Sequence, residues 1–316
     1  MKNSRQSAFQ NKTISLCLAL LVMLLWGSLF PMIKIGYREF KLDSSSIGSL
    51  LFFAGVRFLI SGLMFQAYIA RRDGGVHLPQ KGARLSIVLI ALSVYVLHYI
   101  CLYIGLSHLE SSKTSVLKQI GTLFIICFAF LFRKEDRFTP AKLIGGILGF
   151  ASILVINLDG LSLTWNRFDL LIIAASFFSA ASTVISKNVY DFHDPLYVTG
   201  WAQLFGGITL VVLGLAMGGT LNCFSWSAMA SLVYICLASS IAYALWNMLL
   251  KYNDMSRLNV IKFAETLFSA ICSWILLGEN IFRWIYLAAF MLVCAGILIG
   301  TGRCSGKHSS ACEGEK

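Results

Sequence analysis

Formal charge is scarce in this sequence. Only 13% of its 316 residues are Asp, Glu, Lys or Arg, whereas 57% are hydrophobic. A soluble domain of this length exposes far more charged surface, because much of any globule faces water. Apolar runs of about 20 residues recur instead, which is the length that a helix needs to cross roughly 30 Å of hydrocarbon. We therefore expect an integral membrane protein.

Motifs for catalysis and for metal binding are also missing. The chain has no Walker sequence, no GxSxG, no HExxH and no Asp-rich loop motif. Its nine cysteines are scattered without CxxC or Cys/His spacing. The loops between the apolar runs are too short for a nucleotide-binding domain. These absences argue against an enzyme, a metal site, a cofactor and transport driven by ATP within this chain.

Ten apolar runs are long enough to be transmembrane helices. Backbone groups in lipid must pair within their own segment, and the runs lack the alternation of barrel strands, so each is predicted to be a helix. The first is expected to be a retained signal anchor, because it is too long for a signal peptide and lacks a small-residue cleavage site. The predicted spans are 13–36, 46–69, 85–106, 114–132, 139–157, 168–187, 196–218, 229–251, 258–277 and 281–301.

Basic residues are distributed unevenly between alternate loops. With a cytoplasmic N-terminus, 17 basic residues fall on the cytoplasmic side and 5 on the other. This asymmetry follows the positive-inside rule and predicts a multi-pass protein of the cytoplasmic membrane with both termini inside. The formal charge of +11 is therefore attributed to topology and not to nucleic-acid binding.

The chain contains an internal repeat at an offset of 144 positions. VLKQIGTLF (116–124) aligns with VIKFAETLF (260–268), and Tyr99 aligns with Tyr243. Because each unit holds five helices, an odd number, the second must enter the membrane from the opposite side, as in transporters with inverted repeats. The predicted segments are a cytoplasmic tail (1–12), two five-helix units (13–157 and 168–301) and a disordered cytoplasmic tail (302–316).

Four stretches resemble the EamA family of the drug/metabolite transporter superfamily: WGSLFPMIK (26–34), VRFLISGL (56–63), SSIAYALWNMLLK (239–251) and AETLFSAICSWILLGE (264–279). The resemblance implies ten helices in two inverted EamA units around a central cavity, lined mainly by helices 1, 3, 4, 6, 8 and 9. It also implies export of amino acids or other small metabolites, with more distant relatives carrying phosphorylated sugars and nucleotide-sugars. Family members often have proline where Thr122 and Thr266 stand, so a kink in helices 4 and 9 is left open.

Two lysines fall inside predicted spans at equivalent positions of the repeat. Lys118 and Lys262 are each about the fifth residue of a span, and Thr122 and Thr266 follow four residues later on the same helix face. Glu265 has no acidic counterpart and is spaced to pair with Lys262. An unpaired charge at the bilayer centre costs about 2.5–3.5 kcal/mol. The lysines are therefore either substrate ligands or interface anchors whose stems snorkel to the surface.

Three further polar residues lie inside spans. Lys34 is near the end of the first span and is expected to snorkel. Arg57 lies in the middle of the second span and is expected to bond helix-end carbonyls or a neighbouring helix, in a structural or coupling role. His98 is mid-span, where a histidine is either a packing residue or a proton relay, so proton coupling is left open.

Aromatic residues concentrate on the spans expected to line the cavity. Tyr95, Tyr99 and Tyr103 share one face of the third span. They are either packing residues or the apolar wall of a pocket for a small organic substrate. The predicted substrate-binding residues are Lys118, Lys262, Glu265, Thr122, Thr266, Trp26, His98, Tyr99, Tyr243, Trp246 and Asn247.

The balance of two lysines and one glutamate favours a zwitterion or an anion over a cationic drug. We therefore expect a secondary transporter that exports an amino acid or a related carboxylate by alternating access. The alternatives are an exchanger of phosphorylated sugars or nucleotide-sugars, broad-specificity drug efflux, and a non-transporting membrane enzyme or assembly factor. The expected partners are a small-molecule substrate and the lipid bilayer, without nucleic acid, and homo-oligomerisation is left open.

Overall fold

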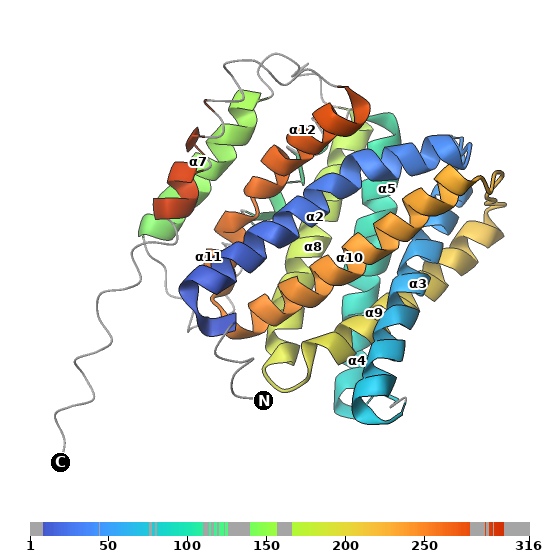
Figure 1. Cartoon of the computed structure of the whole chain (residues 1–316), viewed down its shortest axis with the longest axis horizontal. Helices are drawn as coiled ribbons and strands as arrows, with labels where there is room; N and C mark the ends of the chain where they lie inside the picture. Colours follow the sequence, from blue (N-terminus) through green and yellow to red (C-terminus); the bar gives the residue numbers. More distant parts are fainter. Residues whose placement is uncertain are drawn as a thin grey trace.

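The described part of the chain consists of helices and their connections, without a strand. A computed structural model describes residues 9–43, 45–75, 78–79, 81–109, 114, 117–118, 120–122, 124–125, 140–156, 166–278, 288, 291–292 and 294–299. The principal helices (Figure 1) are α2 (Lys12–Glu39), α3 (Ile47–Asp73), α4 (Lys81–Ile90), the π-helix η1 (Ala91–Leu97), α5 (His98–His108), α7 (Pro140–Ile156), α8 (Arg167–Tyr190), α9 (Pro195–Ala216), α10 (Trp226–Tyr252), α11 (Met255–Ile261) and α12 (Ala264–Leu277).

Several helices begin at capping residues that the sequence makes visible. Asn11 accepts hydrogen bonds from two backbone N–H groups at the start of α2. Asn166 and Asp169 form a reciprocal capping box at the start of α8. Asp194 caps α9 and is followed by Pro195, whose missing N–H needs no partner in the first turn.

Seven helical runs in the described residues are long and apolar enough to cross a membrane. They match seven of the ten predicted spans, with η1 continuing α4 into α5 as one run. The fifth predicted span is the 17-residue α7, whereas fewer than half of the residues of the spans 114–132 and 281–301 are described, and most of both tails lie outside the described residues. Ten helices and the segment boundaries therefore stay predictions. The seven runs are Lys12–Glu39, Ile47–Asp73, Gly82–His108, Arg167–Tyr190, Pro195–Ala216, Trp226–Tyr252 and Arg257–Leu277.

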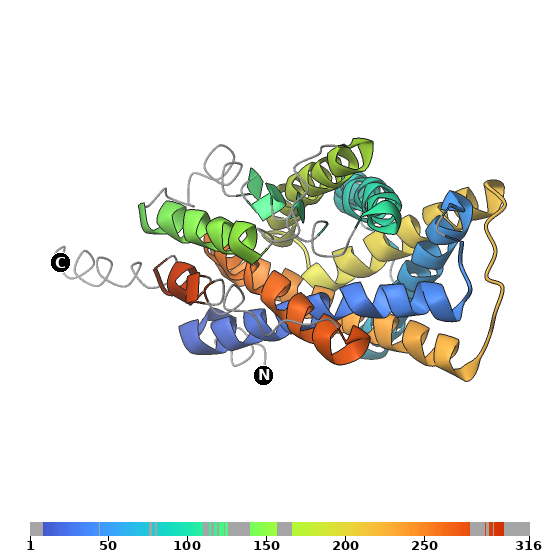
Figure 2. The ribbon, with the colours of Figure 1, turned by 90° about the horizontal axis from the view of Figure 1, so that it is seen from above.

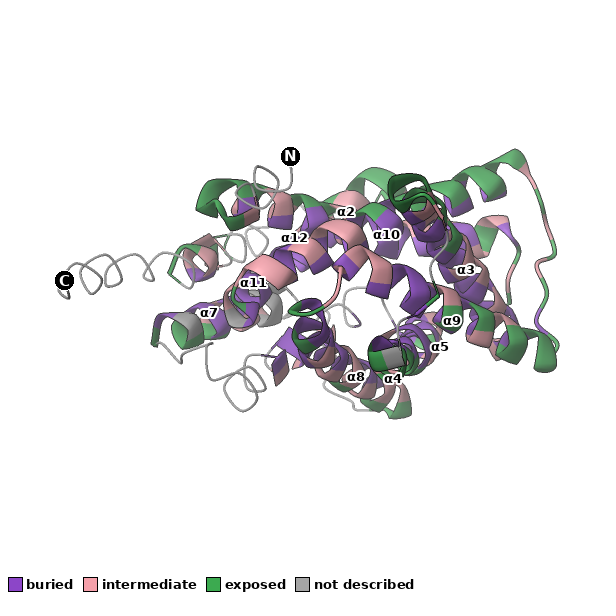
Figure 3. Cartoon of the chain, turned by 90° about the horizontal axis from the view of Figure 1, so that it is seen from below, coloured by how far each residue is buried: buried purple, intermediate pink, exposed green. Residues whose placement is uncertain are grey.

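Large apolar side chains are exposed on the outer faces of the helices. Leu63, Val212 and Ile275 are each more than half exposed, and the buried residues face the interior of the bundle (Figure 3). Such a surface is unfavourable in water but suits contact with lipid chains. The chain is accordingly a multi-pass membrane protein.

Glycines bring α3 against α9 along most of their length (Figure 2). A Cβ added at Gly62 would lie 2.7 Å from the backbone nitrogen of Leu204, and one at Gly55 would lie 2.9 Å from the carbonyl carbon of Leu210. Gly207 makes an equally close approach from α9. Small residues favour helix association in lipid because they let backbones touch. This seam joins the first predicted unit to the second.

The helix α2 packs between α10 and α12 (Figure 1). Gly27 allows the approach, because a Cβ there would lie 2.9 Å from the carbonyl oxygen of Glu265. The first helix of the first unit is thereby fixed against two helices of the second unit. This arrangement sets one wall of the candidate site.

Candidate functional site

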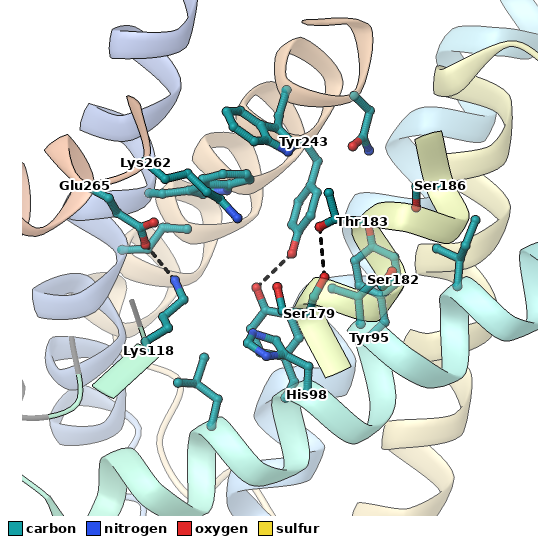
Figure 4. Close-up of a pocket in the computed structure, with 18 of the residues that line it drawn as sticks. Tyr95, His98, Lys118, Ser179, Ser182, Thr183, Ser186, Tyr243, Lys262 and Glu265 are labelled. Atoms are coloured by element: carbon teal, nitrogen blue, oxygen red, sulfur yellow. Dashed lines mark hydrogen bonds and ion pairs between the residues drawn. The ribbon is translucent and has the colours of Figure 1, made fainter. Parts of the chain in front are cut away.

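A cavity that is partly open to solvent lies inside the bundle (Figure 4). Its walls come from α2, the run formed by η1 and α5, α8, α10 and the junction of α11 with α12, so both predicted units contribute. The sequence-predicted residues that line it are Trp26, Arg57, His98, Tyr99, Lys118, Tyr243, Trp246, Asn247, Lys262 and Glu265.

Glu265 forms an ion pair with Lys118. The Oε1 and Nζ atoms are 2.6 Å apart, and the side chains are 3% and 22% exposed. Local pairing of Glu265 with Lys262, which their spacing had suggested, is therefore wrong. The Glu265 carboxylate instead meets Lys118, which is 147 positions away in the sequence, while the ammonium of Lys262 lies against two indole rings. The pair that does form connects the two predicted units (Figure 4).

The ninth predicted span is interrupted between α11 and α12 although it contains no proline. Lys262 and Phe263 form a turn, in which the N–H of Lys262 bonds the carbonyl of Asn259 at 3.2 Å, a three-residue spacing. Phe263 is fully buried, and its ring fills the space beside Gly149 of α7, where an added Cβ would lie 2.6 Å from Cγ. Helix 9 therefore contains a tightened turn within a run that stays right-handed, whereas most of helix 4 lies outside the described residues.

The ammonium group of Lys262 lies against two indole rings. Its Nζ atom is 5.6 Å from the ring centroid of Trp26 and 5.3 Å from that of Trp246. Among the described residues no carboxylate comes within ion-pair distance of it. Cation–π attraction of about 0.5–2 kcal/mol offsets part of the cost of burying the charge. The cavity thus contains one lysine whose charge is not balanced by an acid.

Tyr99 and Tyr243, which the repeat aligns, contact each other directly. Their hydroxyl oxygens are 3.0 Å apart. The Tyr95 ring packs 5.4 Å from that of Tyr243, and the Tyr103 hydroxyl accepts a hydrogen bond from Arg57 at 2.9 Å. The predicted tyrosine face therefore points to the centre of the bundle. It lies at the end of the π-helix η1, a form of turn that is frequent at functional sites.

Arg57 is 1% exposed and is held by neighbouring helices. Its Nε atom donates to the hydroxyl of Ser239 on α10 at 3.0 Å, in addition to the bond to Tyr103 on α5. The guanidinium also lies 4.9 Å from the ring centroid of Phe58. Arg57 therefore bonds neighbouring helices, as one of the two sequence-based options predicted. Its partners are hydroxyl groups, and not the helix-end carbonyls of the other option.

His98 is attached to α8. Its Nδ1 atom lies 2.7 Å from the carbonyl oxygen of Ala175. Because a carbonyl only accepts, Nδ1 carries the proton and donates it. The ring also packs edge-on against Tyr99, with the centroids 4.8 Å apart. This contact fixes the ring orientation where it borders the cavity.

Three predicted residues lie apart from the main cavity. Thr122 borders a smaller adjoining pocket together with Lys118 and Glu265. Thr266 is buried but lines neither pocket. Lys34 is partly buried and also lines neither pocket.

A row of hydroxyl groups on α8 lines the cavity and was missed in the sequence. The spacing i, i+3, i+4, i+7 places these residues on one helix face, opposite Tyr243 (Figure 4). The same periodicity is present in FSAASTVIS (178–186) and is the signal that could have identified them. We name this row the hydroxyl stripe; it consists of Ser179, Ser182, Thr183 and Ser186.

Proteins named as transporters are similar to this chain along most of its length. An uncharacterized transporter of Archaeoglobus fulgidus is 28% identical over 277 residues, covering 85% of this chain and 91% of the relative. A probable amino-acid metabolite efflux pump of Salmonella typhimurium is 23% identical over 300 residues, covering 89% and 93%. A solved crystal structure with 19% identity has a TM-score of 0.73 and covers 90% of this chain and 97% of its own, so the fold is shared.

The family model of the EamA-like transporter family matches this chain twice, over residues 13–158 and 166–301. The two matches leave only the termini and a short connection uncovered. They fit an architecture of two repeats with the cavity between them. The chain belongs to the EamA-like transporter family.

Proposed function

We propose that this chain is a secondary transporter that exports an amino acid or a related small carboxylate by alternating access. The observation that carries the proposal is the excess positive charge in the cavity, where Glu265 neutralises Lys118 and leaves Lys262 unbalanced. A substrate carboxylate would supply the missing negative charge, and a substrate ammonium would find Glu265 and the indole rings. The aromatic walls suit a small organic molecule. The name of the Salmonella relative agrees with this substrate class.

The ion pair between Lys118 and Glu265 would give the substrate a means of moving the two units. A carboxylate that binds Lys118 competes with Glu265, which weakens the connection between the units. Protonation of Glu265 would act in the same direction, so proton coupling is part of the proposal. In either case the shift between states can be no larger than the difference in affinity for the two states.

Counterflow in proteoliposomes tests the proposal with labelled amino acids, sugar phosphates and a cationic dye. We expect amino acids to exchange, and Lys118→Met and Lys262→Met to reduce exchange by about tenfold or more while still folding. Lys12→Met is the matched control, because Lys12 is exposed at the start of α2 and far along the helix from the cavity lining. Exchange at the parent rate in both cavity variants would make the lysines interface anchors and end the proposal.

A phosphorylated sugar is the second candidate, and one observation favours it. Arg57 lines the cavity, as a site for a divalent anion requires. Its guanidinium is, however, bonded to Ser239 and Tyr103, and would have to release them to bind phosphate. Exchange of sugar phosphates without exchange of any amino acid, abolished by Arg57→Lys, would establish this candidate in place of the first.

A further inference from the structure

The hydroxyl stripe on α8 faces the cavity without a role in the proposal above. We infer that the site selects zwitterions whose side chain ends in a hydroxyl or amide group over those whose side chain is purely apolar. The inference rests on the proposed function and names the substrate class of the same site. It assigns specificity to Ser182 and Thr183.

The stripe begins at the charged end of the cavity. Ser179 lines both the main cavity and the smaller pocket, which also contains Lys118, Lys262 and Glu265. One turn earlier, the Ser176 hydroxyl donates to the carbonyl of Lys118 at 3.0 Å, so α8 contacts the lysine-bearing segment directly. The first residue of the stripe is therefore beside the groups proposed to hold the carboxylate and the ammonium.

Helix geometry sets the distance from that end to the rest of the stripe. Ser182 and Thr183 are three and four residues beyond Ser179, which is roughly 4.5–6 Å of helix rise, and Ser186 is roughly 10 Å away. A side chain of three or four heavy atoms spans the first of these distances. When the charged groups of an amino acid lie near Lys118 and Glu265, the end of its side chain therefore reaches Ser182 and Thr183.

The bonding state of these hydroxyls leaves them able to bind a ligand. Ser182 is 3% exposed, and its hydroxyl has no hydrogen-bond partner among the residues that the structure describes. Thr183 is 9% exposed and donates to the carbonyl of Ser179 at 2.9 Å, which leaves its oxygen able to accept. Water in the cavity satisfies such hydroxyls when no ligand is bound, so a ligand that displaces the water has to replace its hydrogen bond, and a side chain that bonds the hydroxyl gains affinity. An apolar side chain in the same place leaves it unsatisfied.

The far end of the cavity continues the polar lining. Asn247 is buried and donates from Nδ2 to the Thr199 hydroxyl at 2.7 Å, which leaves its side-chain oxygen free to accept. The opposite wall presents the rings of Tyr95 and Tyr243. A fully apolar pocket discriminates weakly against an added hydroxyl, whereas a pocket with polar groups discriminates strongly against its loss. This cavity contains polar groups, so we expect it to discriminate against substrates that lack a hydroxyl or amide group.

Competition counterflow with pairs of nearly equal shape tests the inference. The pairs are L-threonine with L-valine and L-glutamine with L-norleucine, each added to proteoliposomes that exchange a labelled amino acid. In the parent we expect the polar member to compete at about tenfold lower concentration than the apolar member. In Ser182→Ala/Thr183→Val the ratio should fall below threefold. If the double variant does not fold, Ser182→Ala alone should at least halve the ratio.

The matched control is Thr209→Val on α9. Thr209 is partly exposed and lines neither pocket, and among the described residues its hydroxyl bonds the carbonyl of Phe205 one turn earlier. In the Thr209→Val variant, the ratio of the competing concentrations of the apolar and polar amino acids should equal that of the parent. Equal competition by valine and threonine in the parent, or an unchanged ratio in the cavity variants, overturns the inference while leaving the proposed function intact. Failure of every amino acid to exchange overturns both.

Discussion

The two lysines of the repeat have different surroundings because only the second unit carries an acid between lysine and threonine. Gly121 stands where a counterpart of Glu265 would be. A Cβ at Gly121 would lie 3.1 Å from the carbonyl oxygen of Ser176 on α8, so the close packing of the helices leaves little room for a longer side chain. One carboxylate therefore serves a cavity with two lysines, and it pairs across the two units with Lys118.

The pair between Lys118 and Glu265 should stabilise the folded protein. Glu265→Gln leaves a partly buried lysine without its counterion, and we expect a loss of about 1–3 kcal/mol in the free energy of unfolding in detergent. The exchanged variant Lys118→Glu/Glu265→Lys should recover most of that loss. A double-mutant cycle with Lys118→Met measures the coupling, and strictly additive losses would show that the two residues do not interact in the folded protein.

At the scale of helices, capping and packing explain most of the arrangement. Lys187, at the end of α8, is one of the 17 basic residues that the loop pattern places on the cytoplasmic side, but its contacts show a second role. It is 8% exposed, and its ammonium donates to the carbonyls of Leu250, Lys251 and Asn253 at 2.6, 3.0 and 3.1 Å. A cation here satisfies the last carbonyls of α10 and opposes the negative end of the helix dipole.

Removing this cap should loosen the end of α10. We expect Lys187→Met to lower the free energy of unfolding by about 1–2 kcal/mol and to increase hydrogen exchange in the last turn of α10. Lys12→Met, at an exposed helix start, serves as the control and should have little effect. Unchanged exchange at Leu249–Asn253 in the Lys187 variant would contradict the capping role.

The seam between α3 and α9 should be sensitive to a single added carbon. We expect Gly62→Ala to lower the melting temperature, because its Cβ would lie 2.7 Å from the backbone nitrogen of Leu204 and force the helices apart. Gly82→Ala on α4 is the matched control, since an added Cβ there meets nothing within 4 Å. It should be neutral or slightly stabilising, by up to about 1 kcal/mol. Equal effects of the two substitutions would contradict tight packing at the seam.

The apolar runs predicted the seven described spans. The repeat predicted that Lys118 and Lys262 would share one cavity, and both line it. The partner of Glu265 could not be predicted, because Lys118 is 147 positions away and meets it only through the packing of the two units. The tightened turn at Lys262 and Phe263 is likewise not marked by a proline in the sequence. The hydroxyl stripe has the spacing of one helix face in the sequence, but spacing alone does not show which face of a helix borders a cavity.

At the scale of the whole molecule, the uneven distribution of basic residues predicts the orientation in the membrane. The loop between α9 and α10 should face outside, and the loop after α3 should face the cytoplasm. The loop between α9 and α10 already contains the partly exposed Cys223. In the loop after α3, a Cβ added at Gly75 would meet nothing within 4 Å, so this position tolerates substitution.

A membrane-impermeant maleimide added to whole cells should label the parent at Cys223. Cys223→Ser should remove this labelling. In a chain that also carries Cys304→Ser and Cys312→Ser, which remove the two cysteines of the C-terminal tail, Cys223→Ser/Gly75→Cys should gain labelling only after the membrane is permeabilised. The reverse pattern, with Gly75→Cys accessible in whole cells and Cys223 protected, would place both termini outside and contradict the predicted topology.

The contact between Tyr99 and Tyr243 has a consequence for the origin of the fold. Two equivalent positions can touch each other only near the axis that relates the two units, as happens at the centre of an isologous dimer. A single five-helix ancestor, inserted in the membrane in both orientations, would have made this contact between two separate copies. Gene fusion would then have freed each half to diverge, and the single acid at Glu265 is an asymmetry that two identical copies cannot carry.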